Sequence, residues 1–337
     1  MAWSTQPEMS VFSLYSKEQT ALKGFIILFV LFSTVSLAQQ IGKAVIPKDV
    51  LMATVLIERA ETHEVTAYVA ASNLVLVVER QGTNTALIPA ENLFRQIKTN
   101  EVSYTPLGSG VLVLWSNRFF IVTAGHVIPS DGNVSFRIPQ NNGKPPEHRP
   151  HKEISQSSGM GWVRSTNADI ILTTISLQQE VDEVKVVPIE NFAATYEKVS
   201  VGDDVFIAGY PVSVVSVADQ AVHVIRNGIV SAKMGNGMIL IDAFTFPGNS
   251  GGPVFWKPAA GLNIFGPIVE GRETWLVGIV LYSHSYTEEA FSPVTGRKRI
   301  TFESNSGLTE IVSTSRILDL FDYPQVHEAF ARWTGKK

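Results

Sequence analysis

The sequence predicts an all-β protein, built as a sandwich or a barrel. Short apolar runs recur between Gly, Pro, Asn and Asp beyond residue 100, as in GVLVLW, FFIVTA, DVFIAGYPV and WLVGIVLY. Runs of this length, rich in β-branched residues and bounded by turn residues, are typical of strands. No stretch of the middle chain alternates such runs with long helical patterns, which disfavours a parallel sheet.

Composition narrows the function classes. The chain has 337 residues, of which 45% are hydrophobic and 17% charged, so it can bury a core as one large domain or as two lobes. The formal net charge is −4, which gives no basic footprint for nucleic acid. The absence of cysteine excludes disulfides, thiolate metal sites and a cysteine nucleophile. No nucleotide-binding fingerprint is present, and we expect no cofactor.

The amino terminus predicts a secretory segment in residues 1–38. Residues 24–38 form an apolar run, short for a membrane span, and Ser36 and Ala38 are small residues at the −3 and −1 positions of a cleavage before Gln39. An uncleaved signal anchor that would hold the protein at a membrane is the alternative, and a buried core helix is another. We expect export to a periplasm or the cell exterior.

Residues 39–100 carry mixed signals. Pro47 followed by VLMATVLIERA could start a helix, whereas VTAYVA and NLVLVVE have the β-branched residues of strands. The segment is either an N-terminal extension with a regulatory role or the first strands of the β-fold.

Helix returns at the carboxyl end. Ser315 can cap RILDLFD, and Pro324 can open a further turn in which Val326, Phe330 and Trp333 share one face. We expect this helical segment to pack on the β-lobe that precedes it.

A serine among glycines is the strongest chemical motif. Residues 246–254 read FPGNSGGPV and follow the apolar run MILIDAF. A glycine-rich turn between strands is the structural alternative. Glycines also let N–H groups near Gly248 and Ser250 converge on one oxyanion while the Ser250 hydroxyl faces the substrate carbonyl. The motif therefore predicts that Ser250 is a nucleophile.

A nucleophilic serine needs a base, and that base needs an acid to orient it. His126, in IVTAGHVI, follows an apolar run and a turn of small residues, although a histidine satisfied within the core would read similarly. Asp169, in NADIILTTI, stands at the head of an apolar strand, where a carboxylate needs a partner. Asp203 and Asp204 are more typical of a turn, and Asp242 of a support for the serine loop.

At this point the chain resembles a known family. GSGVLV with FFIVTAGHVI, then ADIILTTI, VFIAGYP, GIVSA and LIDAFTFPGNSGGPVF are similar, in this order, to the blocks of trypsin-like serine proteases, above all the bacterial HtrA/Deg-type branch. The resemblance covers about residues 108–313. It implies two six-stranded antiparallel β-barrels, one to about residue 190 and one over about 191–312, followed by a C-terminal helix over 313–335.

The resemblance also assigns roles. His126 is implied as general base and acid, Asp169 as its orienter and Ser250 as nucleophile. The N–H groups of Gly248 and Ser250 are implied as oxyanion donors, with Asn249 between them. Asn249 stands where digestive and clotting members have an aspartate that pairs with a newly cut amino terminus, so we expect no activation of that kind. We expect no PDZ-like domain after residue 313.

Substrate preference follows from the walls that the resemblance implies. One wall is Phe244, Thr245 and Phe246; the other is an edge strand that pairs with an extended peptide, with residues Leu281, Tyr282 and Ser283. No carboxylate stands at the matching base position, so an unpaired Lys or Arg would lose solvation there. We expect a small or apolar residue before the scissile bond. Phe244 and Tyr282 could equally be barrel packing, and His284 is expected in a solvated loop.

His148 and His151, three apart in PPEHRPH, cannot form a helical metal pair because of the prolines, and we expect an exposed loop and no metal. The sequence therefore predicts a serine endopeptidase acting on proteins or peptides. A non-catalytic peptide-binding or chaperone-like homologue, and an esterase with the same three residues, are the rival hypotheses. The oligomeric state is left open.

Overall fold

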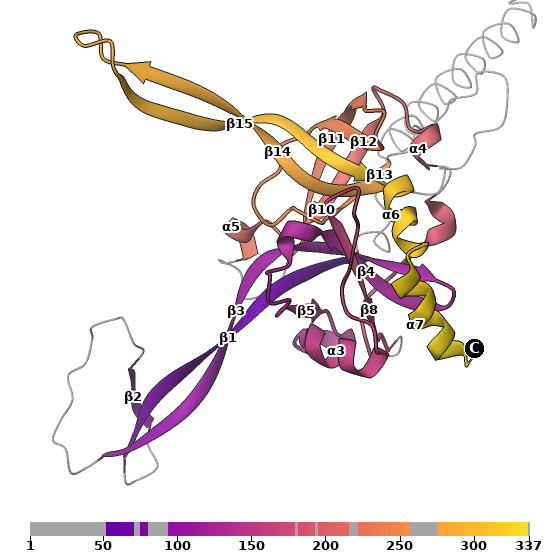
Figure 1. Cartoon of the computed structure of the whole chain (residues 1–337). Coiled ribbons are helices and arrows are strands. Elements are labelled where there is room, and N and C mark those ends of the chain that lie inside the picture. The colour runs from indigo at the N-terminus through magenta and orange to yellow at the C-terminus, as the bar shows by residue number, and fades with distance from the viewer. Residues whose placement is uncertain are drawn as a thin grey trace, which may run out of the picture. The chain divides into compact units, whose positions relative to one another are not determined.

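The structure is a computed structural model that describes residues 52–70, 75–79, 94–178, 181–192, 195–215, 222–256 and 275–335. The predicted secretory segment lies outside these residues. The fold is mostly β, as predicted, and has one sheet in each half of the described chain (Figure 1). None of the described helices combines the length and the apolar character needed to cross a bilayer.

The first half forms a nine-stranded sheet in the order β6-β5-β1-β3-β4-β8-β7, with β2 and β9 attached to β1 and β3. Its ends, β6 and β7, do not pair with each other, so it differs in detail from a closed six-stranded barrel. Helix α3 (His151–Ser158) follows β6 directly and packs against β6 and β8. The strands are β1 (Thr54–Ala70), β2 (Val75–Glu79), β3 (Phe94–Trp115), β4 (Arg118–Ala124), β5 (Ser135–Ile138), β6 (Glu147–Pro150), β7 (Val163–Arg164), β8 (Ile170–Ile175) and β9 (Val187–Pro188).

The second half is a closed six-stranded barrel, which confirms the predicted architecture there. Its order is β10-β11-β12-β15-β14-β13, and every neighbouring pair is antiparallel. Alternate residues of these strands point inward and form a separate apolar core. The strands are β10 (Asp204–Gly209), β11 (Val224–Lys233), β12 (Met238–Asp242), β13 (Pro253–Trp256), β14 (Leu276–Phe291) and β15 (Lys298–Ser313), and the short helices before and after β10 are α4 (Thr195–Lys198) and α5 (Val212–Val215).

Strand β1 decides between the helix and strand predictions at the start of the described chain. Residues from Thr54 onward form a strand that pairs with β3, so the helix that Pro47 could start is wrong over this stretch. Val55 and Ile57 are buried in the first core, and such alternation is what a strand needs. The opening strands of the β-fold therefore lie within residues 39–100.

The C-terminal helices contact both sheets, the barrel that precedes them in the chain and the first sheet. Ser313, and not Ser315, stands at the N-cap position of helix α6 (Thr314–Phe321), where its side chain makes no capping hydrogen bond. Helix α7 (Pro324–Thr334) begins at the predicted proline. Phe321 lies edge-on to Phe120 of β4, at 5.2 Å between ring centroids. Helix α6 packs on β14 and β15 of the barrel, as expected, and also on β8. The aromatic contacts of both helices with the first sheet were not expected, and they include Phe330 of α7 on Trp115 of β3.

Candidate active site

His126 lies where β4 ends. The buried strand FFIVTA gives way to a short 3₁₀ turn, Gly125–Val127, that carries the histidine. A side chain at Gly125 would collide with the guanidinium of Arg164 and the carboxylate of Asp169. The small residue before His126 is thus required by close approach of the acid and not only by the turn.

Asp169 reaches His126 because neighbouring strands place them at the same edge. It directly precedes β8, and β8 pairs with β4 so that Ala124 lies opposite Ile170. His126 Nδ1 lies 2.7 Å from Asp169 Oδ2, and the His126 backbone N–H donates to the same oxygen at 3.3 Å. With Nδ1 donating to the carboxylate, Nε2 remains an acceptor for a proton.

Arg164 completes this corner, and the sequence analysis assigned it no role. Its guanidinium donates to the carbonyl of Gly125 at 3.1 Å and lies 3.5 Å from Asp169 Oδ1. The arginine therefore contacts the carboxylate oxygen that His126 does not use and fixes the turn before the histidine. Arg164 belongs to no sequence motif, so the sequence alone does not indicate that it contacts Asp169.

The Ser250 loop is held by glycines in conformations that other residues rarely adopt. Gly248 has φ +98° and Gly251 has φ +78°. A side chain at Gly251 would collide with the Ser109 carbonyl and the Thr123 hydroxyl, and would approach the Ala124 N–H to 3.0 Å. The loop therefore packs directly on β3 and on the end of β4, two residues before His126.

Gly108, on β3, also shows how closely the loop of Ser250 packs against the turn of His126. A Cβ at Gly108 would lie 2.7 Å from the side chain of Val127 and 3.0 Å from the carbonyl oxygen of Ser250. The backbone of Ser250 and the residue after His126 thus share one neighbour. The structure brings together the loop of Ser250 and the turn of His126, which are more than a hundred residues apart in the sequence.

The Ser250 hydroxyl donates to the carbonyl of Leu281 at 3.1 Å. Leu281 lies on β14, two residues after Ile279, the last residue that pairs with β13. In this structure the hydroxyl is therefore bonded to the strand predicted to bind substrate.

Ser109 holds the serine loop from β3, and its role was missed from the sequence. Its hydroxyl donates to the Gly248 carbonyl at 2.7 Å and accepts from the Tyr210 N–H at 2.9 Å, and its own N–H donates to the Ser250 carbonyl at 2.9 Å. The side chain is fully buried. Two of these hydrogen bonds hold the loop of Ser250, at the Gly248 and Ser250 carbonyls, and the third joins Ser109 to Tyr210, which follows β10.

In the loop of Ser250, the backbone N–H of Asn249 is hydrogen-bonded, whereas those of Gly248 and Ser250 are not, in the part of the chain that the structure describes. The Asn249 N–H closes a turn on the Phe246 carbonyl at 2.9 Å. Within the described residues, the N–H groups of Gly248 and Ser250 donate to no acceptor. Asn249 is buried, its Oδ1 accepts from the Phe246 N–H at 3.0 Å, and its Nδ2 has no partner among the described residues.

On the side of the serine loop where the first pocket wall was expected, the hydrogen bonds and ring contacts of Thr245 and Phe246 with described residues involve neutral groups, apart from the Arg226 guanidinium, and include no carboxylate. Thr245 is buried and its hydroxyl lies 2.8 Å from that of Thr309, while Asn305 donates to the Thr245 carbonyl at 2.7 Å. Phe244 and Phe246 are 54% and 42% exposed, which is not the burial of barrel packing. The Arg226 guanidinium stacks over the Phe246 ring at 4.6 Å from its centroid.

The second predicted wall, on β14, is half exposed. Tyr282 is 49% exposed, and a hydrogen bond from its hydroxyl to Glu310 raises the pKa of that hydroxyl. His284 was expected in a loop, but it lies in β14, where its Nε2 is 3.4 Å from Glu310 Oε2. The pairing of β14 with β15 places the acid beside both residues.

The two histidines expected in an exposed loop lie in regular structure. His148, in β6, has its Nδ1 3.0 Å from the buried carboxylate of Glu58 and stacks on Tyr104. His151 begins α3, is buried, and lies 3.0 Å from the Thr173 hydroxyl. Long-range packing that a local proline pattern does not encode made the loop assignment wrong. The described residues contain no group of acids and histidines arranged to hold a metal ion.

The remaining acids play other parts. Asp203 accepts from the Ser200 N–H at 2.8 Å, as expected of a turn residue before β10. Asp242 is exposed at the end of β12. Neither contacts His126 in the hydrogen bonds of the described residues, whereas Asp169 does.

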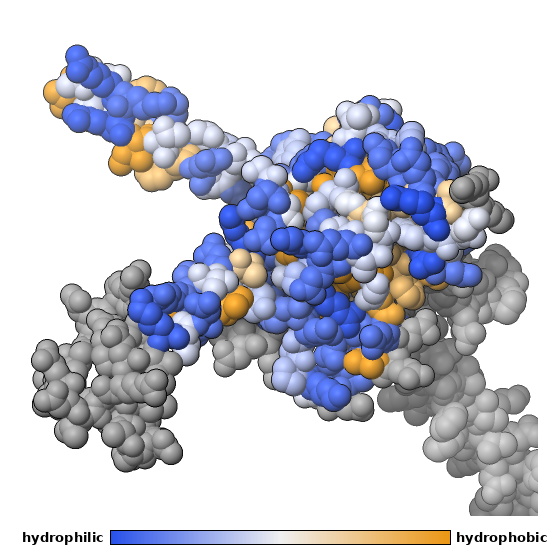
Figure 2. All heavy atoms as spheres, turned by 60° about the horizontal axis from the view of Figure 1, so that its bottom comes forward, coloured by the Kyte–Doolittle hydropathy of each residue, from blue (hydrophilic) through white to orange (hydrophobic). Residues whose placement is uncertain are grey.

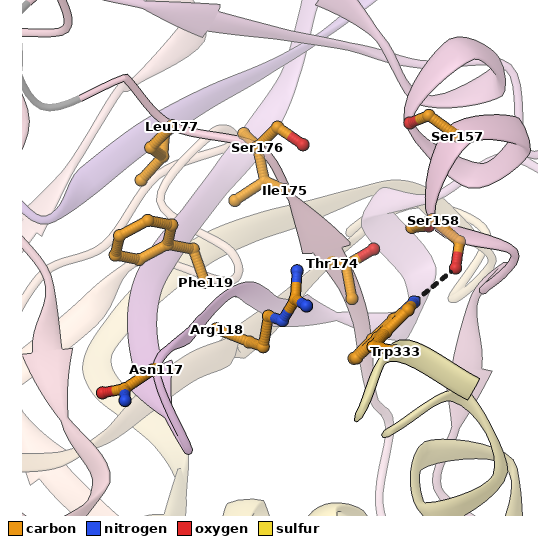
Figure 3. A pocket seen from close by; sticks show the side chains of 10 residues that line it. All are labelled: Asn117, Arg118, Phe119, Ser157, Ser158, Thr174, Ile175, Ser176, Leu177 and Trp333. Carbon is orange, nitrogen blue, oxygen red and sulfur yellow. Dashed lines mark hydrogen bonds between the residues drawn. The ribbon is translucent and has the colours of Figure 1, made fainter. Parts of the chain in front are cut away.

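A separate cavity of about 320 Å³ lies beside α7 (Figure 3). Arg118 points into it, with its guanidinium 5.3 Å from the centroid of Trp333, whose indole N–H donates to the Ser158 carbonyl. His126, Asp169 and Ser250 are not among the residues that line it.

The comparisons agree with the order of motifs. Residues 108–259 match the family described as "Trypsin-like peptidase domain". No curated protein sequence matches the chain. Among solved structures, an HtrA-type protease, AlgW, with a decapeptide is 16% identical, with a TM-score of 0.41 and coverage of 82% of this chain and 64% of that one.

A serine endoprotease from Yersinia pestis is 17% identical, with a TM-score of 0.44 and coverage of 83% of this chain and 65% of that one. The chain thus spans just under two thirds of both proteins. The match of residues 108–259 to the trypsin-like peptidase domain confirms the resemblance that the motifs predict.

Proposed function

We propose that the protein is a serine endopeptidase that cleaves peptide bonds through an acyl-enzyme. The observation that carries this proposal is the 2.7 Å contact of His126 with Asp169 at the strand edge on which the Ser250 loop packs. A histidine whose Nδ1 donates to a carboxylate presents an accepting Nε2, which is the state that a general base requires.

The proposed cycle begins with a movement of the Ser250 hydroxyl. The hydroxyl now donates to the carbonyl of Leu281 and has to rotate so that its O–H points to His126 Nε2 before attack. The Leu281 carbonyl is also the acceptor that we assign to the N–H of the residue before the scissile bond. Substrate binding would then compete for that carbonyl and release the hydroxyl towards the base.

The next steps follow from the same atoms. The Ser250 oxygen attacks the carbonyl carbon while His126 takes its proton, and the N–H groups of Gly248 and Ser250 donate to the oxyanion. His126 then protonates the leaving amine, and water enters to release the acid product. Asp169 stays ionised, orients the imidazole and stabilises its charged form.

We propose a small or apolar residue before the scissile bond. Thr245, Thr309 and Asn305 are neutral, and they satisfy one another through hydrogen bonds. A Lys or Arg side chain placed against them would lose hydration without gaining a carboxylate. Cleavage of a peptide library with Arg as the best residue at this position would refute the preference.

Two further proposals concern how the protein is used. We propose that it is exported, because residues 24–38 and the small residues before Gln39 read as a secretory segment. Sequencing of the amino terminus of the mature protein tests the cleavage. We also propose that no internal cut is needed for activity, since the buried Asn249 amide already closes its own turn.

Casein and peptide cleavage test the proposed activity. Ser250→Ala should lower kcat by about 10⁶-fold while the melting curve stays unchanged. Ser103→Ala, on the exposed part of β3, is the matched control and should retain full activity. Casein left intact by the wild-type protein would favour the binding homologue, and ester hydrolysis without peptide cleavage would favour the esterase.

A further inference from the structure

Strands β14 and β15 continue beyond the barrel as a two-stranded arm, residues 284–304 (Figure 1). Strand β13 pairs with β14 only at Leu276–Ile279, and β12 pairs with β15 only at Leu308–Val312. From Leu281 to Phe291, the edge of β14 that faces β13 has no further strand partner among the described residues. A two-stranded ribbon of this kind is marginal in water unless something packs on it.

The arm has one apolar face. In its register Glu288 lies opposite Phe302, Ala290 opposite Ile300 and Tyr286 opposite Ser304. Because successive side chains of a strand point to opposite faces, these six share one face. Tyr286, Ile300 and Phe302 are each more than half exposed, and the Glu288 carboxylate is bound by the Tyr286 hydroxyl at 2.5 Å.

The other face of the arm is polar except at its tip, where Phe291 is 57% exposed. Thr287 lies opposite Glu303, and Glu289 opposite Thr301, while Lys298 lies 2.7 Å from Glu289. Figure 2 shows apolar side chains on the arm beside hydrophilic ones. Tyr286, Ile300 and Phe302 are thus exposed large side chains gathered in a strip on one face, which is typical of an interaction site.

The apolar face continues the predicted substrate strand. Thr309 and Asn305 both bind Thr245, so they lie on the same face of the β14–β15 pair, the face of the first pocket wall. Their chain neighbours Glu310 and Ser304 therefore lie on the opposite face, together with the cross-strand partners Tyr282 and Tyr286. From Tyr282 to Ala290 this strip is about 26 Å long, at about 3.3 Å per residue.

We propose that the arm is an extended substrate-binding surface that takes unfolded polypeptide with apolar residues at alternate positions before the scissile bond. The proposal rests on the proposed protease function. A substrate paired antiparallel with Leu281 and Ser283 would run, towards its own amino terminus, along the open edge of β14. If the side chain of the residue before the scissile bond faces Thr245, the residue preceding it faces Tyr282. Every second residue from there towards the amino terminus of the substrate then faces the apolar strip of the arm.

The test compares two peptides that share one cleavage sequence. The short peptide has about three residues before the scissile bond, and the long peptide has about ten, with apolar residues at every second position. The wild-type protein should cleave the long peptide with a kcat/KM about 10-fold higher or more, because two or three large side chains lose contact with water. A long peptide with serine at those positions should show no such advantage.

The arm variant is Tyr286→Ser with Phe302→Ser, and its matched control is Thr287→Ala with Thr301→Ala on the polar face of the same ribbon. The arm variant should lose the advantage of the long peptide and keep the activity on the short one, and the control should keep both. Equal loss on both peptides, or no loss on either, would overturn the proposal.

Binding measurements separate this proposal from the proposed function. In a Ser250→Ala background, fluorescence anisotropy should show tighter binding of the long apolar peptide, and the arm substitutions should remove that difference. This result would support the arm even if the wild-type protein cleaved neither peptide. Equal binding of all three peptides would overturn the proposal even if cleavage occurred.

A membrane and a second copy of this chain are the other occupants that the arm could bind, and each would give a different experimental result. Arm-dependent sedimentation with anionic phospholipid vesicles, with the long-peptide advantage unchanged by the arm variant, would assign the strip to a membrane. An arm-dependent dimer in analytical ultracentrifugation, again with unchanged peptide kinetics, would assign it to a second copy of this chain. Either result contradicts the substrate surface proposed here.

Discussion

Replacing Ser109 by alanine should weaken both stability and catalysis, because its hydroxyl joins β3 to the loop of the proposed nucleophile, Ser250. The hydroxyl is fully buried and makes two hydrogen bonds, to the Gly248 carbonyl and from the Tyr210 N–H. Ser109→Ala leaves both backbone groups without a partner. Each buried orphan costs about 1–3 kcal/mol, so we expect about 2–6 kcal/mol lower stability to unfolding.

The catalytic effect follows from the same bond. The Gly248 carbonyl belongs to the peptide before Asn249, and that segment presents the proposed oxyanion donors. Loss of a single donor lowers kcat by about 10²–10³, so a displaced loop should lower kcat by about 10²-fold with little change in KM. Urea denaturation and steady-state kinetics on a short peptide measure the two effects. Ser103→Ala is the control, and a Ser109→Ala protein of unchanged stability and kcat would refute the reasoning.

Three further predictions rest on other parts of the fold. Asp169→Asn should lower kcat by about 10⁴-fold without loss of fold, because the His126 tautomer is no longer fixed; kinetics within tenfold of wild type would remove the acid from the mechanism. Phe321→Ala should cost about 3–5 kcal/mol, since the ring is buried edge-on against Phe120, and a denaturation midpoint equal to wild type would contradict the helix packing. Burial lowers the pKa of His151 to about 4, so the stability it contributes is present above pH 6.5 and lost as the pH falls towards 4. The loss should reach about 3 kcal/mol and should be absent in His151→Gln, as urea titrations across this range would show.

The candidate site residues could be predicted from the sequence where the proposed chemistry restricts which residue types can stand next to them. A side chain at Gly251 would strike Ser109, and one at Gly248 would strike the Tyr210 carbonyl. A glycine-rich loop after a strand is visible in the sequence alone. His126 and Asp169 could be named because each stands at the end of an apolar run. Adjacent strands in one sheet then bring such ends together.

Long-range packing was the part that local patterns could not supply. Nothing near His148 or His151 in the sequence indicates that Glu58 or Thr173, far away in the chain, would be the partner. The aromatic face of the last helices could be predicted, but not that it would cross to the first sheet. The Ser109 hydroxyl was missed for the same reason, since both of its partners lie in the second half.

The central claim is that His126 activates Ser250, and covalent labelling tests it most directly. After reaction with a fluorophosphonate, peptide mapping by mass spectrometry should place the adduct on Ser250 in the wild-type protein. His126→Ala should reduce the labelling rate by orders of magnitude while the protein stays folded. An adduct on another residue, or equal labelling of Ser250 without His126, would contradict the account.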